Sequence, residues 1–332
     1  MIPTLDIAPL FGPAGKARDT TDRALAEAAT GPGFLVVTGL PPEVPLDDRS
    51  RSALAAIFAL PESEKRRLWR QKFAPENRNV YRGYFPVQNG AATYKEGIDL
   101  GPDLTDPDRI RANGDPLLEP TPLPDELSLP GWRDSATRYY RSMEQVAGLL
   151  MGALARGLEI DESIFATPFA RGISTLRLIH YPLRPPESFA GAERTIVVEH
   201  DDETRQLVGA PHADSGIVTL LNQDATGGLQ ARSSEGRWLD VPPRSRSPVV
   251  NFGKLLELWT GGRVRATEHR VLAASQPRLS IPFFFEPRAD ALIQPLSLSG
   301  RPAAPFRYGD YLWQRMVNFV EFRGIERRMA HR

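Results

Sequence analysis

The feature that most constrains the fold is a change of pattern near residue 170. From there to about residue 285 the chain consists of short β-prone runs separated by Gly- and Pro-rich turns, at Thr175–Ile179, Thr195–Val198, Ile217–Leu221, Val249–Phe252, Val264–Thr267 and Ile281–Phe285. Many short strands between such turns are typical of a sandwich or barrel, and jelly rolls are the version that commonly holds a metal. We therefore predict a mainly β fold with flanking helices and a jelly-roll core.

The first half of the chain has a different pattern. Good helix formers predict helices over residues 20–30 and 48–60, and a β-prone run at 34–37 lies between them. The clearest amphipathic helix follows Trp132, with one apolar face made of Met143, Val146, Ala147, Leu150, Met151, Leu154 and Leu158. Residues 71–130 are rich in Pro, Gly, Asn and Asp, and we interpret them as ordered loops that bring Tyr81, Tyr84 and Phe85 to a substrate pocket.

Charge and cysteine content narrow the function. Lys plus Arg and Asp plus Glu both number 41 in the 332 residues, so a nucleic-acid or membrane partner is not indicated and a small-molecule substrate is favoured. The chain has no cysteine, which excludes disulfides, zinc-thiolate sites, iron–sulfur clusters and cysteine nucleophiles. The first residues lack the pattern of a signal peptide, and no apolar run has the roughly 20 residues of a membrane span, so we expect a cytoplasmic protein.

Two of the five histidines stand where metal ligands would be expected. His212 and Asp214 form an HxD motif ahead of the apolar run at Ile217–Leu221, so both side chains would project from one side of an extended segment. His269 follows 57 residues later, in a second β-prone region, and could arrive from a neighbouring strand. Three protein ligands of this kind leave positions open for a co-substrate and dioxygen on iron(II). Zinc, nickel or copper would also accept these ligand types.

A possible anion site follows His269 closely. Arg278 and Ser280 are two residues apart in the β-prone run that continues into Ile281–Phe285, so both side chains would point to the same side of the strand. A guanidinium fork beside a hydroxyl is suited to gripping a carboxylate through paired, charge-assisted hydrogen bonds. An organic diacid co-substrate fits this pair, although Arg278 alone could equally be pairing with a surface acid. We interpret a second polar group, Glu199 to Asp202, as part of a solvated loop within a polar insertion at 187–206.

With these motifs the sequence resembles the isopenicillin N synthase-like family of iron(II)/2-oxoglutarate-dependent oxygenases. The resemblance covers nearly the whole chain and is most specific in LRLIHYP, GAPHADSGIVTLL, VVNFGKLLELWTGGRVRATEHRV and RLSIPFFFEP. It implies a double-stranded β-helix core, iron(II) on His212, Asp214 and His269, and 2-oxoglutarate held by Arg278 and Ser280. Tyr181 matches a position whose hydroxyl often assists with that carboxylate. One departure is Ile179, where the family frequently has Asn.

The resemblance also organises the chain and its reaction. We expect one catalytic domain over residues 1–332, in which a helical and loop region at 1–165 packs on a jelly-roll core at 170–290, followed by a C-terminal segment at 291–332. The expected reaction is oxidation, most simply hydroxylation, of a small molecule with dioxygen, with release of succinate and carbon dioxide. Desaturation or ring closure, an oxidase that uses no 2-oxoglutarate, and a metal-dependent binding protein without catalysis are the alternatives. The primary substrate stays open.

Overall fold

The computed structural model describes residues 1–88, 93–110, 114–189, 196–200, 203–296, 304–319 and 321–325. Two sheets dominate these residues, and their strands pair antiparallel except for the parallel pair β1–β2. The larger has the strand order β1-β2-β11-β8-β13-β5-β4-β3, and the smaller has the order β10-β9-β12-β7-β6. The larger sheet comprises β1 (Thr4–Asp6), β2 (Phe34–Thr38), β3 (Gly83–Phe85), β4 (Glu96–Leu100), β5 (Thr175–Tyr181), β8 (Val218–Gln223), β11 (Val249–Phe252) and β13 (Arg278–Phe285). The smaller comprises β6 (Val197–His200), β7 (Glu203–His212), β9 (Leu229–Arg232), β10 (Trp238–Asp240) and β12 (His269–Leu272).

The two sheets enclose one apolar core, and the helices cover a second on the outer face of the larger sheet. The inner core lies between the sheets and includes Phe34, Ile179, Tyr181, Val208 and Val271. The helices that frame the fold are α1 (Lys16–Thr30), α2 (Asp48–Ala55), α3 (Glu62–Leu68), α4 (Trp132–Gly157), α5 (Ser163–Phe169), α7 (Lys254–Trp259) and α8 (Tyr308–Met316). A short pair, β14 (Leu292–Ile293) and β15 (Phe306–Arg307), precedes α8. This is the predicted mainly β, jelly-roll architecture with flanking helices.

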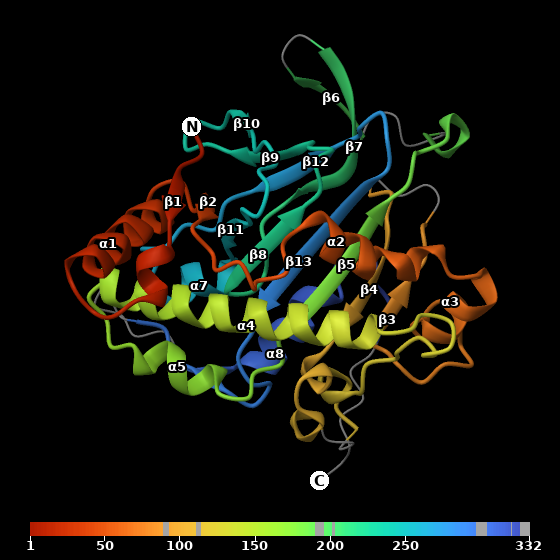
Figure 1. Ribbon diagram of the computed structural model, residues 1–332, viewed down its shortest axis with the longest axis horizontal. Coiled ribbons are helices and arrows are strands. Elements are labelled where there is room, and N and C mark those ends of the chain that lie inside the picture. Colours follow the sequence, from red (N-terminus) through yellow and green to blue (C-terminus); the bar gives the residue numbers. More distant parts are fainter. Residues whose placement is uncertain are drawn as a thin grey trace.

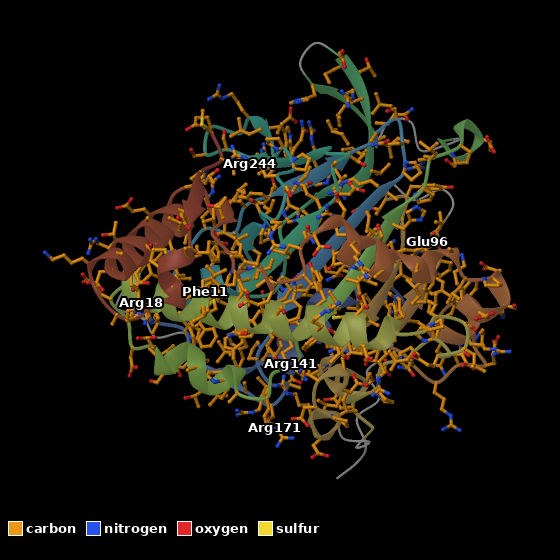
Figure 2. The ribbon with its side chains drawn as sticks, viewed as in Figure 1. Phe11, Arg18, Glu96, Arg141, Arg171 and Arg244 are labelled. Atoms are coloured by element: carbon orange, nitrogen blue, oxygen red, sulfur yellow. The ribbon has the colours of Figure 1, made fainter. Side chains whose placement is uncertain are left out.

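Helix α4 is the main support of the larger sheet and runs across it in Figure 1. Its apolar face is buried, as its 3.6-residue periodicity predicts. The ring of Tyr140 packs edge-on against Phe283 of β13, and its hydroxyl donates a hydrogen bond of 2.7 Å to the carbonyl of Ser174. On the other side of the helix, exposed charged groups such as Arg141 point to solvent (Figure 2). The helix therefore holds β5 and β13 from behind while their other face lines the interior.

Most sequence predictions of individual elements are confirmed, and two are wrong. Val264–Thr267 is not a strand, because its backbone N–H groups bond elsewhere: Arg265 N–H donates to Ala29 at the end of α1 and Ala266 N–H donates to the Glu257 carboxylate. The strand begins two residues later, at His269. The polar insertion at 187–206 is not entirely a loop either. It contains β6 and the start of β7, which pair as a hairpin that projects from the fold (Figure 1).

The sequence predicted the β-prone run at Thr195–Val198, which overlaps β6, but not its pairing with β7, and there is a physical reason for this. Along β6 and the start of β7 exposed and half-buried positions dominate, so the strands lack the apolar alternation that marks a half-buried strand.

Within the described residues, no helix is both long enough and apolar enough to cross a bilayer.

Candidate active site

The metal-ligand candidates meet at the open end of the smaller sheet. His212 is the last residue of β7 and His269 the first residue of β12, and the two strands pair so that these histidines are direct cross-strand partners. Their ring centroids lie 4.3 Å apart. Asp214 lies two residues beyond β7, with Oδ1 at 3.7 Å from Nε2 of each histidine. Among the described residues, this is the group of His and carboxylate side chains whose donor atoms, all within 4.8 Å of one another, could hold a metal ion.

Hydrogen bonds behind the three side chains determine which atoms face inward. Nδ1 of His212 lies 2.8 Å from the carbonyl of Ala210, and Nδ1 of His269 lies 3.3 Å from the carbonyl of Thr267. A carbonyl only accepts, so each Nδ1 carries a proton and Nε2 is the ring nitrogen that faces Asp214. Such bonds are typical of metal-ligating histidines, whose orientation and tautomer they set.

Asp214 is held in the same manner by two residues that the sequence analysis missed. Thr219 Oγ1 donates to Asp214 Oδ2 at 2.5 Å, and Asn251 Nδ2 donates to the same oxygen at 2.7 Å. Oδ1 is left facing the histidines. The signal was present in the sequence, because Thr219 and Asn251 stand on paired positions of β8 and β11, but only the sheet register places them beside Asp214.

The electrostatics of the group favour a metal over protons. Burial, with help from the neighbouring His269, lowers the pKa of His212 to about 4, so its imidazole is neutral at physiological pH. The pKa of Asp214 lies below its ordinary value: burial raises it, but the two histidines and the hydrogen bonds from Thr219 and Asn251 lower it by more. The neutral imidazole of His212 and the ionised carboxylate of Asp214 are donors that need no proton to be removed before a divalent ion binds.

Arg278 lies deeper in the interior, on β13. Its side chain is almost entirely buried, with Nε donating to the carbonyl of Gly227 at 2.8 Å and Nη2 to Gln223 at 3.3 Å. The guanidinium carbon sits 5.1 Å from the centre of the Tyr181 ring on the adjacent strand. Nη1 is buried and has no hydrogen-bond partner among the described residues. Ser280, also buried, follows at the next inward position of the same strand. An unpaired, desolvated guanidinium N–H is costly unless an anion binds it.

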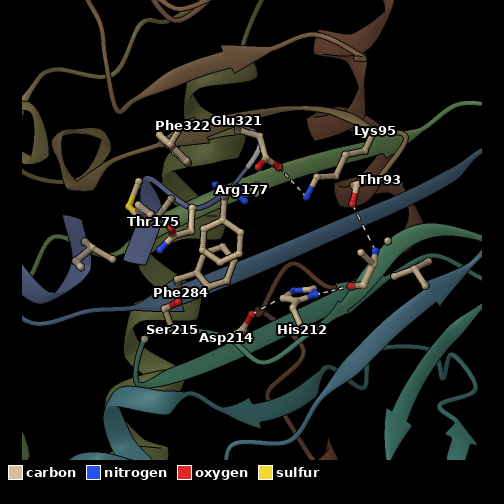
Figure 3. Close-up of a pocket in the computed structure, with 18 of the residues that line it drawn as sticks. Thr93, Lys95, Thr175, Arg177, His212, Asp214, Ser215, Phe284, Glu321 and Phe322 are labelled. Atoms are coloured by element: carbon tan, nitrogen blue, oxygen red, sulfur yellow. Dashed lines mark hydrogen bonds and ion pairs between the residues drawn. The ribbon is translucent and has the colours of Figure 1, made fainter. Parts of the chain in front are cut away.

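A cavity of about 380 Å³ opens beside His212 (Figure 3), and neither His269 nor Arg278 is among its lining residues. His212 and Asp214 form one side, and Tyr81, Arg177 and Lys95 contribute to the rest. Of the three aromatic residues proposed for substrate contact, Tyr81 lines this cavity. Tyr84 and Phe85 do not line it: the Tyr84 hydroxyl bonds to Glu96, and the Phe85 ring lies behind Arg177, 5.4 Å from its guanidinium carbon.

One further titratable group borders the cavity. Glu286, just beyond β13, is buried and accepts a hydrogen bond of 3.1 Å from Thr175 Oγ1. Burial raises the pKa of Glu286 to about 7, with the Arg82 guanidinium acting in the opposite direction. Gly216, two residues after Asp214, lies close to this carboxyl group. A Cβ atom on Gly216 would be 4.0 Å from Glu286 Oε1.

Comparison with known proteins identifies the family. The model of the 2OG-Fe(II) oxygenase superfamily matches residues 176–287, and that of the non-haem dioxygenase N-terminal region, described from morphine synthesis, matches residues 2–126. A 2-oxoglutarate-Fe(II) type oxidoreductase of Emericella nidulans is 32% identical over 87% of this chain and 80% of its own length. The chain belongs to the 2-oxoglutarate/iron(II) oxygenase superfamily.

Other relatives place it in the isopenicillin N synthase-like branch that the sequence resembles. Isopenicillin N synthase of Streptomyces clavuligerus is 29% identical over 94% of this chain and 93% of its own length. A full-length Neurospora crassa protein, crystallised in complex with alpha-KG, superposes with a TM-score of 0.77 at 26% identity, over 95% of this chain and 96% of that one. The protein is accordingly an oxidoreductase, a 2-oxoglutarate-dependent dioxygenase whose cofactor is iron(II) and whose co-substrate is 2-oxoglutarate.

The residues present fit both groups. For iron, the fit rests on the donor chemistry of two imidazoles and one carboxylate, a ligand set that would leave coordination positions open. For 2-oxoglutarate, it rests on the buried and unpartnered Nη1 of Arg278, which a carboxylate would satisfy. Ile179, at the position where the family frequently has Asn, is buried in the apolar core between the sheets.

Proposed function

We propose that this chain hydroxylates a small organic substrate with iron(II) bound by His212, Asp214 and His269. The observation that carries the assignment is the inward convergence of three donor atoms whose opposite atoms are already hydrogen-bonded. When bound, iron and 2-oxoglutarate supply the oxidising chemistry: one oxygen atom of dioxygen goes to the substrate and the other to succinate, with loss of carbon dioxide. The chain's own residues orient the reactants and exclude water.

We propose that Arg278 and Ser280 bind the distal carboxylate of 2-oxoglutarate, with Tyr181 beside them. Arg278 is fixed by its bonds to Gly227 and Gln223, so Nη1 is presented to the co-substrate without further rearrangement. The Tyr181 ring against the guanidinium limits the positions that the side chain can take. A buried cation and a buried hydroxyl on one face of β13 give the carboxylate both charge and direction.

For the primary substrate we propose the cavity that begins at His212 and Asp214. Tyr81 is proposed to contact the substrate directly, while Tyr84 and Phe85 act from behind the cavity wall by holding Glu96 and Arg177 in place. We also propose that the chain works as a single catalytic domain, in which the region 1–165, the core 170–290 and the segment 291–332 all contribute to one site. The first region contributes Tyr81 to the site, the core contributes the three iron ligands, and the last segment contributes Met316.

The deciding experiment is an anaerobic titration of metal-free protein with iron(II) and then 2-oxoglutarate. A chelated 2-oxo acid on iron(II) gives a visible charge-transfer band, which is expected in the wild type and lost in Asp214→Ala and in Arg278→Ala. His200→Ala is the matched control, because His200 lies on the projecting β6 hairpin away from the site. Iron binding without a band would contradict the co-substrate assignment.

A second candidate function is an oxidase that takes all its electrons from its substrate. The observation that favours it is the similarity to isopenicillin N synthase over 94% of the chain. In that case Arg278 and Ser280 would hold a carboxylate of the substrate itself. Succinate release discriminates the two: the dioxygenase forms one succinate for each 2-oxoglutarate consumed, whereas the oxidase forms none.

A further inference from the structure

The wall of the cavity opposite the iron-ligand candidates carries an unusual group of charges. Figure 3 shows Lys95, Arg177 and Glu321 on one side of the cavity and His212 and Asp214 on the other. Behind Arg177 lie Asp99 and Arg70, both fully buried. These five charged side chains, Arg70, Lys95, Arg177, Asp99 and Glu321, are called the cationic cluster below.

The cationic cluster contains more positive than negative charge. Asp99 accepts two hydrogen bonds from Arg177, at 2.6 and 2.8 Å, and a further one from Arg70. Glu321 forms an ion pair of 2.9 Å with Lys95. Within the cluster, three cations thus share two carboxylates. A buried excess of one positive charge is unfavourable unless an anion from outside compensates it.

Only part of the cluster is accessible from the cavity. Arg70 and Asp99 have no exposed surface, whereas the side chains of Lys95 and Arg177 are 17% and 16% exposed and line the cavity. Arg177 uses Nε and Nη2 for Asp99, and Nη1 makes no hydrogen bond to a described residue. The ammonium of Lys95 pairs only with Glu321 among the described carboxylates. Two N–H donor groups with a net positive charge therefore face the space where a substrate would lie.

Glu321 shows that a carboxylate fits against Lys95, at a cavity wall to which Arg177 also contributes. It belongs to the segment after α8, and its side chain is only 4% exposed. The pKa of Glu321 is held far below its ordinary value, because the attraction of Lys95 and Arg177 outweighs the cost of burial. This internal carboxylate sits where an external one would be attracted by the same two cations.

We propose that the primary substrate is an organic acid whose carboxylate binds Lys95 and Arg177 in exchange with the Glu321 side chain. This proposal rests on the proposed function, since it names the substrate class of the same site. The body of the acid would lie along Phe284, which lines the cavity between the cluster and the iron ligands (Figure 3). The C–H bond that is oxidised would then lie at the end of the molecule away from the carboxylate.

The test compares three head groups on the same body. Benzoate, phenylpropionate and octanoate are each compared with the corresponding primary amide and primary amine, in calorimetric titrations of the anaerobic protein loaded with iron(II) and 2-oxoglutarate. At least one acid is expected to bind about tenfold or more tightly than its amide, the affinity that one charge-assisted hydrogen bond supplies. The amines are expected to bind worst.

Two variants locate the preference within the cavity. Lys95→Met should remove most of the difference between acid and amide, whereas Lys16→Met, an exposed lysine at the start of α1, serves as the control for loss of one positive charge. Glu321→Gln removes the internal competitor and should strengthen acid binding by about tenfold or more on the same scale. Weaker acid binding in Glu321→Gln would overturn the exchange.

The remaining outcomes are equally decisive. The proposal is overturned if amide and acid bind alike for every body, or if the amines bind best, since Glu321 would then be the recognition group for a cation. It is also overturned if Lys95→Met loses the 2-oxoglutarate band, because Lys95 would then hold the co-substrate. Failure of the proposed function looks different: the wild type itself would lack the band, whatever acid is added.

Discussion

At the scale of single residues, Thr219 and Asn251 have the most specific role outside the ligand set. Both donate to Asp214 Oδ2 and leave Oδ1 to face His212 and His269. Without them the carboxylate could rotate, and a buried lone pair would lose its partner. Groups that orient metal ligands in this way typically change metal affinity by about 10- to 100-fold when removed.

We therefore predict that Asn251→Ala and Thr219→Val each weaken iron(II) binding by about 10- to 100-fold. The measurement is an anaerobic iron titration of the metal-free variants. Thr204→Val on the exposed β7 end of the hairpin is the control for loss of a hydroxyl. Unchanged iron affinity in both site variants would contradict a positioning role for these residues.

Glu286 gives a prediction about pH. Its folded pKa of about 7 lies above the ordinary value of 4.5, so the folded chain holds this proton more tightly than the unfolded chain does. The stability that this contributes is fully present below about pH 4.5 and is lost as the pH rises through 7. The loss is of order 3 kcal/mol.

Glu286→Gln should remove this dependence, because the amide does not titrate. The free energy of unfolding of the wild type, measured in urea, is expected to fall relative to that of Glu286→Gln between about pH 5 and pH 8. The exposed Glu27→Gln on α1 should instead follow the wild type at both pH values. Parallel pH profiles of wild type and Glu286→Gln would refute the shift.

At the scale of elements, the contact between α1 and α4 depends on one glycine. A Cβ at Gly157, the last residue of α4, would lie 2.1 Å from the backbone oxygen of Asp22 in α1. The close approach also lets Arg156 bind Asp22 through two hydrogen bonds of 2.6 and 2.9 Å. Neither helix can move freely, because α4 in turn packs on β13 and β8.

The same substitution at two places of α4 should therefore have opposite effects. Gly157→Ala is expected to destabilise the chain by about 1–3 kcal/mol, since α1 must shift. Gly148→Ala, where a Cβ meets nothing within 4 Å, should stabilise it by up to about 1 kcal/mol through better helix propensity. Urea midpoints of the two variants check both signs. Equal midpoints would show that the helix pair absorbs the extra methyl.

At the scale of the whole molecule, the metal joins segments that are distant along the chain. His212 and His269 are 57 residues apart and belong to paired strands of the smaller sheet, while Asn251, which supports Asp214, belongs to the larger sheet. Because the donor set exists only when both sheets are folded, a metal that binds it stabilises the native state alone.

Iron(II) at about a hundred times its dissociation constant is thus expected to stabilise the folded chain by about 2.7 kcal/mol. The measurement is the thermal midpoint under anaerobic conditions, with and without metal. Asp214→Ala should show no metal-dependent rise, whereas His200→Ala should rise as the wild type does. A rise that persists in Asp214→Ala would mean that the metal binds elsewhere.

Periodicity and motif were sufficient for the architecture and for the candidate ligands. The 3.6-residue face of α4 and the apolar runs of β5, β8, β11 and β13 follow from local burial, which leaves its mark on successive residues. The HxD motif and the pair Arg278 and Ser280 stand out because each places two functional side chains two residues apart, on one side of an extended segment. His269, 57 residues after His212, was recognised from its β-prone surroundings and from the family resemblance.

The contacts between distant segments were decided by the tertiary structure alone. The bonds of Thr219 and Asn251 to Asp214, the excess positive charge of the cationic cluster, and the entry of Glu321 into the cavity all depend on sheet register and on how the last segment returns to the core. The pairing of β6 with β7 in the projecting hairpin was not predicted, because these strands lack an apolar face. Such features involve residues far apart along the chain, and no local pattern records which of them the fold brings together.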